Sequence, residues 1–270
     1  MAVNEDIGAE LVHEARQLQS RMVLGTRVDA TSYEDASDRV IDWATAGESR
    51  YVCIATVNNV MEAHDDPDYL DDMNGSDLTT PDGMPLVWGL KRLGVTEATR
   101  VYGPDLTPVV LDKATARHIP VGFYGGAPEV LAKLVEVCRT RWPGLEIRYA
   151  YSPPFRPLSE EGDKRIVDEI NSSGARILFV GLGCPKQETW MATHRGHVRA
   201  AMLGVGAAFD FLTGSKKQAP GFVQRAGLEW LFRLMTEPRR LWRRYLRHNP
   251  RFVALFGAQI VRQRFERTGS

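Results

Sequence analysis

Short apolar runs that end at glycine or at polar turn residues alternate with segments of helical periodicity as far as Gly214. Runs of this kind, without polar alternation, are typical of strands that a sheet buries on both faces. The pattern predicts one strand in each of the segments 50–56, 77–83, 119–126, 145–152, 175–183 and 200–214. Because helical patterns separate these strands, the expected fold is α/β, with a Rossmann-like, mostly parallel sheet and helices on both of its faces.

The helices between these strands are predicted from their periodicity and from signals at their ends. Pro85 and Pro185 suit the first turns of two helices, and Asp105 suits the N-cap of another. The predicted helices lie at 58–74, 85–93, 103–118, 127–142, 159–174 and 184–195. The first of them has an acidic face that includes Asp66 and Asp68, which we interpret as a solvated surface and not as a metal site.

The segment after Gly214 carries no strand signal and predicts helices on both sides of Pro238. After Pro238, Leu241, Trp242 and Tyr245 are expected on one side of the predicted helix and arginines on the other. We therefore divide the chain into a polar extension at 1–22, an α/β domain at 23–215, and a basic amphipathic helical appendage at 216–270.

Charge is distributed unevenly between these parts, although the formal net charge of the chain is zero. Residues 216–270 hold 13 Lys and Arg and 3 acidic residues, a net of +10, so the remaining residues carry −10. A basic amphipathic helix with tryptophan suits an anionic membrane surface. Alternatively its apolar stripe packs on the α/β domain, or the first helix packs while the second contacts lipid. Nucleic acid is not an expected partner, because the acidic domain would repel a polyanion and no nucleic-acid-binding motif is present.

Composition and cysteine usage point to a protein of a reducing compartment. The chain is 43% hydrophobic and 25% charged, as is typical of globular domains. Its cysteines, Cys53, Cys138 and Cys184, provide neither a disulfide framework nor a zinc-binding spacing. The chain starts without the apolar run of a signal peptide, and no stretch is long enough to span a bilayer. We therefore expect a cytoplasmic protein.

Polar residues and glycines follow several of the predicted strands, and parallel α/β sheets bind ligands at these carboxyl ends. They are Thr56, Asn58, Gly125, Gly126, Gly181, Gly183, Gly204 and Gly206. Glycine turns let a backbone approach phosphates, so a nucleotide diphosphate is the expected ligand, unless the glycines only permit tight turns. The dinucleotide fingerprint and the P-loop are absent, and His194 and His197 have no third ligand nearby, so no metal site is predicted.

Two further positions are candidates for chemistry. Asp82 stands in a Pro-Asp-Gly turn before a helix, where it is either a turn residue or a general base at the rim of a cleft. Lys186 and Gln187 fall in the first turn of a helix, where a lysine opposes the helix dipole unless it faces an anion. Gln187 offers a donor and an acceptor to a sugar or a base; alternatively both residues are ordinary surface positions.

Seven segments occur in order from Thr56 to Tyr245: TVNNVMEA, TPDGMPLVW, RVYGPDL, FYGG, VGLGCPKQE, VGAAFDF and GLEWLFRLMTEPRRLWRRY. In order and spacing they resemble the WecG/TagA/CpsF family of bacterial glycosyltransferases, over roughly residues 23–256. The resemblance implies inverting, metal-independent transfer of an N-acetylmannosamine-type sugar from a UDP donor. The acceptor would be a polyprenyl-diphosphate-linked sugar at the inner face of the plasma membrane, in the synthesis of a cell-surface polysaccharide. No cofactor is implied, because the UDP-sugar is a substrate.

The same resemblance implies roles for individual residues. Asp82 aligns with the catalytic base, and Thr56 and Asn58 align with polar groups near the anomeric carbon. Arg100 and Gln187 align with substrate-binding residues, and the glycine turns at Gly125, Gly126, Gly183 and Gly206, with Lys186, complete the expected substrate site. In the appendage, Arg233, Arg240 and Arg243 are the candidates to stabilise the leaving diphosphate. The appendage would thus complete the active site and also attach the protein peripherally to the membrane.

Two alternatives to this hypothesis stay open. The first is a non-catalytic membrane adaptor built on a nucleotide-binding α/β domain, which would bind vesicles and leave UDP-sugars intact. The second is a family member that uses a different UDP-hexose, since related hexoses differ by a few pocket contacts. The sequence also leaves open whether the protein forms a homo-oligomer.

Overall fold

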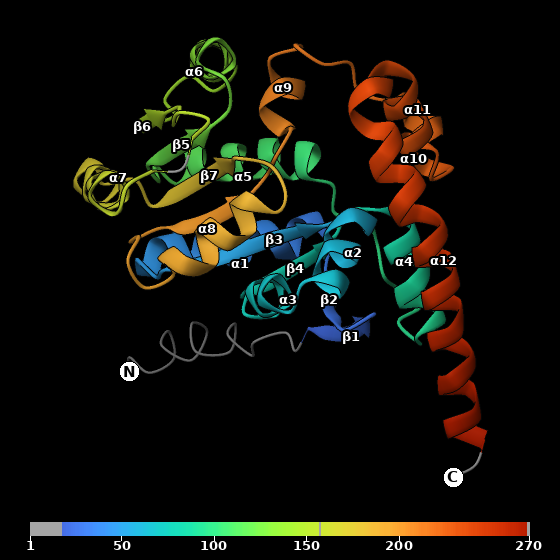
Figure 1. The fold of residues 1–270 in the computed structure, drawn as a ribbon. Coiled ribbons are helices and arrows are strands. Elements are labelled where there is room, and N and C mark those ends of the chain that lie inside the picture. Colours follow the sequence, from blue (N-terminus) through green and yellow to red (C-terminus); the bar gives the residue numbers. More distant parts are fainter. Residues whose placement is uncertain (1–17, 157, 269–270) are drawn as a thin grey trace, which may run out of the picture.

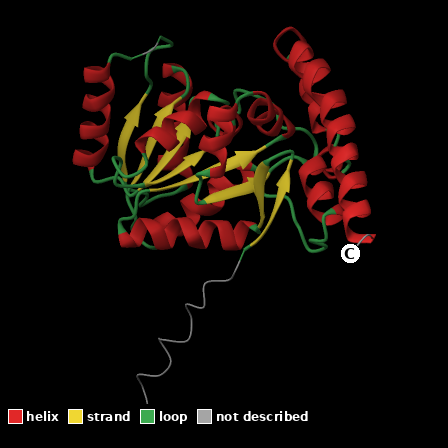
Figure 2. Ribbon diagram, turned by 60° about the horizontal axis from the view of Figure 1, so that its bottom comes forward, coloured by secondary structure: helices red, strands yellow, loops and turns green. Residues whose placement is uncertain are grey.

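Residues 18–156 and 158–268 are described in a computed structural model, and its central element is a parallel sheet of six strands (Figure 2). The strand order is β4-β3-β8-β7-β5-β6, and every neighbouring pair runs parallel. The strands are β3 (Arg50–Ala55), β4 (Leu78–Pro81), β5 (Val121–Gly125), β6 (Ile147–Tyr151), β7 (Ile177–Gly181) and β8 (Ala201–Gly204). Each strand lies within a segment where one was predicted, so the predicted α/β class is confirmed.

Helices cover both faces of this sheet, and each face has its own apolar core (Figure 1). Side chains alternate along β3, with Tyr51 and Cys53 in one core and Val52 and Ile54 in the other. One face is covered by α1 (Tyr33–Ala46), α5 (Gly103–Ala116), α6 (Pro128–Arg141) and α9 (Ala208–Leu212). The other is covered by α2 (Val57–Asp65), α3 (Pro67–Asn74), α4 (Met84–Arg92), α7 (Glu160–Ser173) and α8 (Lys186–His194).

Three predicted helix starts differ from the structure. The single helix predicted at 58–74 is two helices, because Pro67 has no N–H to continue α2 and instead starts α3. The Asp66 side chain caps α3 by accepting a hydrogen bond from the Asp68 N–H at 3.0 Å. Asp105 is not the N-cap of α5, because that helix starts two residues earlier, after Tyr102. Pro185 is the N-cap of α8 and not a residue of its first turn.

A β-hairpin that the sequence did not predict precedes α1. Its antiparallel strands are β1 (Gln19–Val23) and β2 (Thr26–Ala30), and its turn holds Leu24 and Gly25 at positive φ. Strand β1 begins inside the stretch expected to be a polar extension at 1–22, of which residues 1–17 lie outside the described residues. The Asp29 carboxylate ties the hairpin to β4, accepting a hydrogen bond from the Thr79 N–H at 2.7 Å.

The appendage is helical on both sides of Pro238, as predicted. It consists of α10 (Gly221–Arg225), α11 (Glu229–Thr236) and α12 (Pro238–Thr268), and α12 runs along one side of the molecule next to α4 (Figure 1). The second helix packs on the α/β domain more closely than the first, and its contact with lipid stays a prediction. Helix α11 buries none of its residues, whereas α12 buries Leu241, Phe252 and Phe256 against the α/β domain.

Polar contacts hold α12 in place at two points along its length. Arg251 pairs with Asp65 of α2 at 2.6 Å, and Arg247 reaches the same carboxylate at 3.2 Å. Further along, the Gln259 side chain accepts a hydrogen bond from the Leu24 N–H at 2.9 Å and donates one to the Met22 carbonyl at 2.7 Å. The unpredicted hairpin therefore supports the far part of α12.

Candidate active site

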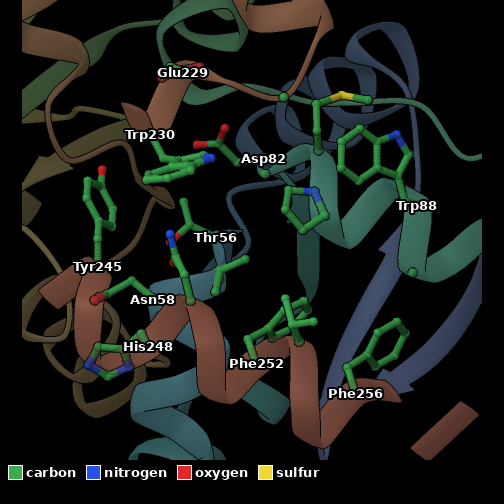
Figure 3. Close-up of a pocket in the computed structure, with 18 of the residues that line it drawn as sticks. Thr56, Asn58, Asp82, Trp88, Glu229, Trp230, Tyr245, His248, Phe252 and Phe256 are labelled. Carbon is green, nitrogen blue, oxygen red and sulfur yellow. The ribbon is translucent and has the colours of Figure 1, made fainter. Parts of the chain in front are cut away.

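A cavity of about 510 Å³ lies where β3 and β4 end, between these strands, α4 and the appendage. In the sheet Ala55 pairs with Pro81, so the next residues, Thr56 and Asp82, leave the sheet side by side. The Asp82 N–H donates to the Ala55 carbonyl at 2.9 Å, which fixes the turn. Figure 3 shows Asp82 and Thr56 in the upper part of the cavity and Phe252 and Phe256 in the lower part.

Asp82 shares one guanidinium with a second carboxylate. Arg100 Nη2 lies 3.0 Å from Asp82 Oδ1 and 2.5 Å from Glu229 Oε2, and Arg100 Nε donates to the Asp82 carbonyl. Arg100 also donates to Gln224 Oε1 at 3.2 Å and lies over the Tyr102 ring. Among the described residues, Asp82 Oδ2 has no hydrogen-bond partner, so it is free to take a proton.

Burial raises the pKa of Asp82 to about 7; Arg100 opposes this rise, and the Glu229 carboxylate adds to it. Desolvation alone would lower the pKa of Arg100, but the two carboxylates overcome it and raise that pKa above its ordinary value. A carboxyl group with a pKa near 7 is suited to general-base catalysis close to neutral pH. This environment is compatible with Asp82 as a general base, a role that stays a prediction.

Thr56 and Asn58 occupy the start of α2 beside this group. Thr56 is the N-cap, and its Oγ1 donates to Asn59 Oδ1 at 2.7 Å while the Thr56 N–H donates to the same oxygen at 3.1 Å. Asn58 Nδ2 donates to Cys184 Sγ at 3.1 Å, and Asn58 Oδ1 is buried without a partner among the described residues. The cavity is thus joined to the loop between β7 and α8.

The glycine turns predicted to bind substrate lie along this loop and its neighbours, outside the cavity lining. Strands β5 and β7 are adjacent, and the chain leaves them in opposite directions along the sheet, toward β6 and toward β8. Such a switch point is where parallel α/β sheets bind ligands. The chains are close here, because a Cβ on Gly125 would lie 2.6 Å from the backbone of Gly181. Gly126, Gly183 and Gly206 follow β5, β7 and β8 and have positive φ.

Gln187 and Lys186 stand at the start of α8 in different environments. Gln187 is buried, accepts a hydrogen bond from the Gly183 N–H at 3.1 Å and donates one to Glu188 at 2.9 Å. Glu188 also accepts from Asn59 Nδ2 at 3.1 Å, and burial raises the pKa of Glu188 to about 7. Lys186 is exposed. The expected surface alternative is therefore wrong for Gln187, which supports the loop next to Asn58.

A model of the glycosyl transferase WecG/TagA/CpsF family matches residues 21–267. The chain belongs to this family. It is also 36% identical over 187 residues to the N-acetylglucosaminyldiphosphoundecaprenol N-acetyl-beta-D-mannosaminyltransferase of Bacillus spizizenii, a match that covers 68% of this chain and 70% of the relative. The resemblance inferred from the sequence motifs is confirmed, and the cavity is a candidate glycosyltransferase active site.

Of the three appendage arginines predicted to stabilise the leaving group, Arg233 lines the cavity, and Arg240 and Arg243 do not. Arg233 of α11 lines it, together with Arg244 of α12, and the Nε of each is buried without a partner among the described residues. Arg240 instead pairs with Glu237 at 2.6 Å, and Arg243 is exposed and lies over the Trp242 ring. Arg243 lies about 100° around α12 from Arg244, which turns it away from the cavity.

Several residues that line the candidate site were not predicted from sequence. Glu229 and Trp230 start α11, Trp88 belongs to α4, and Tyr245 and His248 belong to α12. Burial lowers the pKa of His248 below its ordinary value, although Glu62 lies 3.6 Å from its Nε2 and opposes the change. The helical spacing of Tyr245, His248 and Phe252 was visible in the sequence, but the side of the helix that meets the domain was not.

Within the described ranges, no group of three or more His, Cys, Asp or Glu side chains is placed to hold a metal ion. No helix of the same residues is long and apolar enough to cross a membrane.

Proposed function

We propose that the protein transfers an N-acetylmannosamine-type sugar from a UDP donor to a polyprenyl-diphosphate-linked sugar, with inversion and without a metal ion. The name of the Bacillus spizizenii relative supports the transferred sugar and a lipid diphosphate acceptor. The observation that carries the chemistry is the placement of Asp82, which is held through Oδ1 by Arg100 and has Oδ2 free beside the end of β3.

In the proposed reaction, an acceptor hydroxyl oxygen attacks the anomeric carbon of the donor sugar. The bond from that carbon to the diphosphate breaks on the opposite face, so the configuration inverts and UDP leaves with the bonding electrons. The hydroxyl proton passes to Asp82 Oδ2. Because an alcohol is a far weaker acid than Asp82, proton transfer has to accompany the attack and not precede it.

Arg233 and Arg244 are the proposed partners of the leaving diphosphate. Both line the cavity, and an arginine Nε that is buried without a partner is poised to donate to an anion. These two positive charges would stabilise the negative charge that develops on the leaving UDP, a role that a divalent cation has in some other glycosyltransferases. The uridine end would lie toward the glycine turns of β5, β7 and β8, next to Asn58 and Thr56. Full turnover in the presence of EDTA is therefore expected.

We also propose that the appendage attaches the protein peripherally to the inner face of the plasma membrane. Its outer face combines exposed apolar side chains, such as Leu231, Met235 and Leu246, with the exposed arginines Arg239 and Arg243. Basic helices with apolar side chains bind the headgroup region of anionic bilayers. A membrane location would bring the active site to a lipid-linked acceptor.

The test is a panel of UDP-hexosamines, their uronic acids and UDP-hexoses, assayed for UDP release with a synthetic lipid-linked acceptor. Turnover with the N-acetylmannosamine donor is expected, with the anomeric configuration of the product inverted. Turnover with another UDP-hexose alone would reassign the donor, and no turnover with any donor would refute the enzyme hypothesis in favour of a binding protein. The Asp82→Asn variant should bind UDP-sugar as the parent does and lose most of its turnover.

A further inference from the structure

The apolar half of the cavity has no task in the reaction described above. The residues of α12 that line the cavity recur every three or four positions, so they form one stripe along the helix. The first turns of this stripe are polar and include Tyr245 and His248. The following turns are apolar and include Phe252, Phe256 and Ile260. A ligand that follows the stripe meets a change from polar to apolar surface.

The opposite wall of this apolar stretch is α4, which contributes Met84, Pro85 and Trp88. Trp88 lines the cavity from α4 and is 48% exposed, while part of its ring packs against Gly227, where an added Cβ would lie 2.7 Å from the ring. Val253 lines the same cavity from α12 and is 70% exposed. Exposed apolar side chains that converge on a cavity from two helices indicate a binding site.

Two glycines shape the gap between α4 and α12. A Cβ on Gly89 would lie 3.0 Å from the Phe256 ring, so this glycine lets the two helices approach closely at one point. A Cβ on Gly257 would have no heavy atom within 4 Å, so the gap is open at the next position of α12. Because Asp65 and Gln259 fasten α12 to the domain, the helix is held across the gap.

The shape and charge of the cavity fit one class of ligand. From Tyr245 to Ile260 the helix advances about 22 Å at about 1.5 Å per residue, so the site suits an elongated molecule. Its polar end holds Asp82, the proposed base for the acceptor hydroxyl, and the apolar turns begin at Phe252, one helical turn beyond His248. The complementary molecule has a sugar at one end, a diphosphate next to it, and then a long apolar chain.

We propose that the apolar stretch between α4 and α12 binds the first isoprene units of the acceptor lipid. The chain then runs from the diphosphate past Trp88, Phe256 and Gly257 and leaves the protein near Ile260, the last residue of α12 in the cavity lining. This inference rests on the proposed function, because it takes the acceptor to be lipid-linked. It adds that the enzyme binds the lipid chain directly, as well as the sugar at the end of the acceptor.

The test is a pair of phenylalanine substitutions on neighbouring residues of α12. Gly257→Phe fills the open gap, and it should fold because the Cβ has space and glycine is a poor helix former. Ala258→Phe is the matched control, since Ala258 is exposed, lies outside the cavity lining and points about 100° away. Each variant is assayed with a polyprenyl acceptor and with a water-soluble acceptor that carries the same sugar and diphosphate on a short alkyl chain.

Gly257→Phe is expected to raise the KM for the polyprenyl acceptor at least tenfold and to leave the KM for UDP-sugar and turnover of the short-chain acceptor unchanged. Ala258→Phe should change none of these. An unchanged KM for the polyprenyl acceptor in Gly257→Phe would overturn the inference. So would a changed oligomeric state with normal acceptor kinetics, because the groove would then be a subunit interface.

A second measurement does not depend on turnover. A photoreactive polyprenyl diphosphate without a sugar is expected to label peptides that contain Trp88 and Phe256, less so in Gly257→Phe. Labelling confined to the outer face of α11 and α12 would overturn the inference. Labelling at Trp88 and Phe256 by a protein that transfers no sugar would refute the proposed function and leave the lipid site standing.

Discussion

Asp82 and Glu229 are two carboxylates that compete for the single guanidinium of Arg100. The arrangement has two effects on Asp82, the proposed base. Arg100 fixes the orientation of Asp82, while burial and the second carboxylate keep its pKa near neutrality. A base held by an arginine alone would be a much weaker base, because the cation would stabilise its charged form. Glu229, which the appendage supplies, therefore raises the pKa of a residue in the turn that follows β4.

The pH dependence of kcat/KM should show this tuning. The base must be ionised to act, so kcat/KM is expected to rise with pH through about 7, the pKa of Asp82. Glu229→Gln removes a charge that raises this pKa, and the rise should move to lower pH. The control is Glu237→Gln, since Glu237 pairs with Arg240 outside the cavity. Equal shifts in the two variants would show that the appendage does not tune the base.

The cavity arginines should differ from the exposed ones in turnover. Removing one donor to a developing anion typically costs about 10²-fold to 10³-fold in kcat, so Arg233→Ala and Arg244→Ala are each expected to lose about that much. Arg243→Ala should stay within about threefold of the parent, because an exposed side chain outside the site contributes little. If steady-state kinetics ranked Arg243 with the other two, α12 would be rotated in the working enzyme.

At the scale of the elements, α12 belongs to the active site as much as the strands do. It contributes cavity residues along most of its length, and its position depends on α2 and on the β1–β2 hairpin. Arg251 and Arg247 lower the pKa of Asp65 to about 2, so this carboxylate stays ionised and paired at any pH above about 4. The pairing is lost as the pH falls toward 2.

Asp65→Asn tests the role of this pairing without touching the cavity. Loss of the carboxylate should speed hydrogen exchange of α12 amides near Arg251 and raise the KM for the acceptor, while the sheet keeps its protection. Asp68→Asn serves as the control, because Asp68 is exposed on α3 and forms no ion pair with the described residues. Identical exchange in parent and Asp65→Asn would mean that apolar packing alone holds the helix.

Local sequence patterns predicted the strands that are buried on both faces. They did not predict the β1–β2 hairpin or the side of α12 that faces the domain. All six strands of the sheet were predicted, because a short unbroken apolar run such as Ile177–Gly181 is compatible with few structures other than a buried strand. The hairpin was missed because β1 has a mixed polar composition and is stabilised by distant residues such as Gln259. Thr56 and Asp82 were predicted as site residues, but their adjacency depends on the pairing of β3 with β4. The side of α12 that faces the domain is set by packing at Phe252 and Phe256, so the family resemblance could not distinguish Arg243 from its neighbour Arg244.

At the scale of the whole molecule, the appendage, of charge +10, lies against the α/β domain at 23–215, of charge −8. Part of this charge is used internally, as in the pairs between Asp65 and the arginines of α12. The exposed remainder on α11 and the start of α12 shares its surface with Leu231, Met235 and Leu246. Such a surface has both an electrostatic and an apolar means of binding a bilayer.

Vesicle sedimentation should separate these two contributions. Binding to anionic vesicles is expected to weaken as ionic strength rises, because salt screens exposed charge. Joint replacement of Arg239 and Arg243 by alanine should weaken it further, at about 1 kcal/mol per residue. Replacing Arg117 and Arg139, which are exposed at the end of α5 and on α6 and so lie outside the appendage, is the matched control. If both pairs reduced binding equally, the appendage would not be the membrane-facing surface.

Trp88 and Trp230 stand in the cavity lining on two different helices, α4 and α11. Indole emission responds to the polarity around the ring, so the protein carries its own optical reporters at this site. Replacing each in turn by phenylalanine would assign a spectral change to one helix or the other. The order in which donor and acceptor enter then becomes measurable by stopped-flow mixing, with no label attached to protein or substrate.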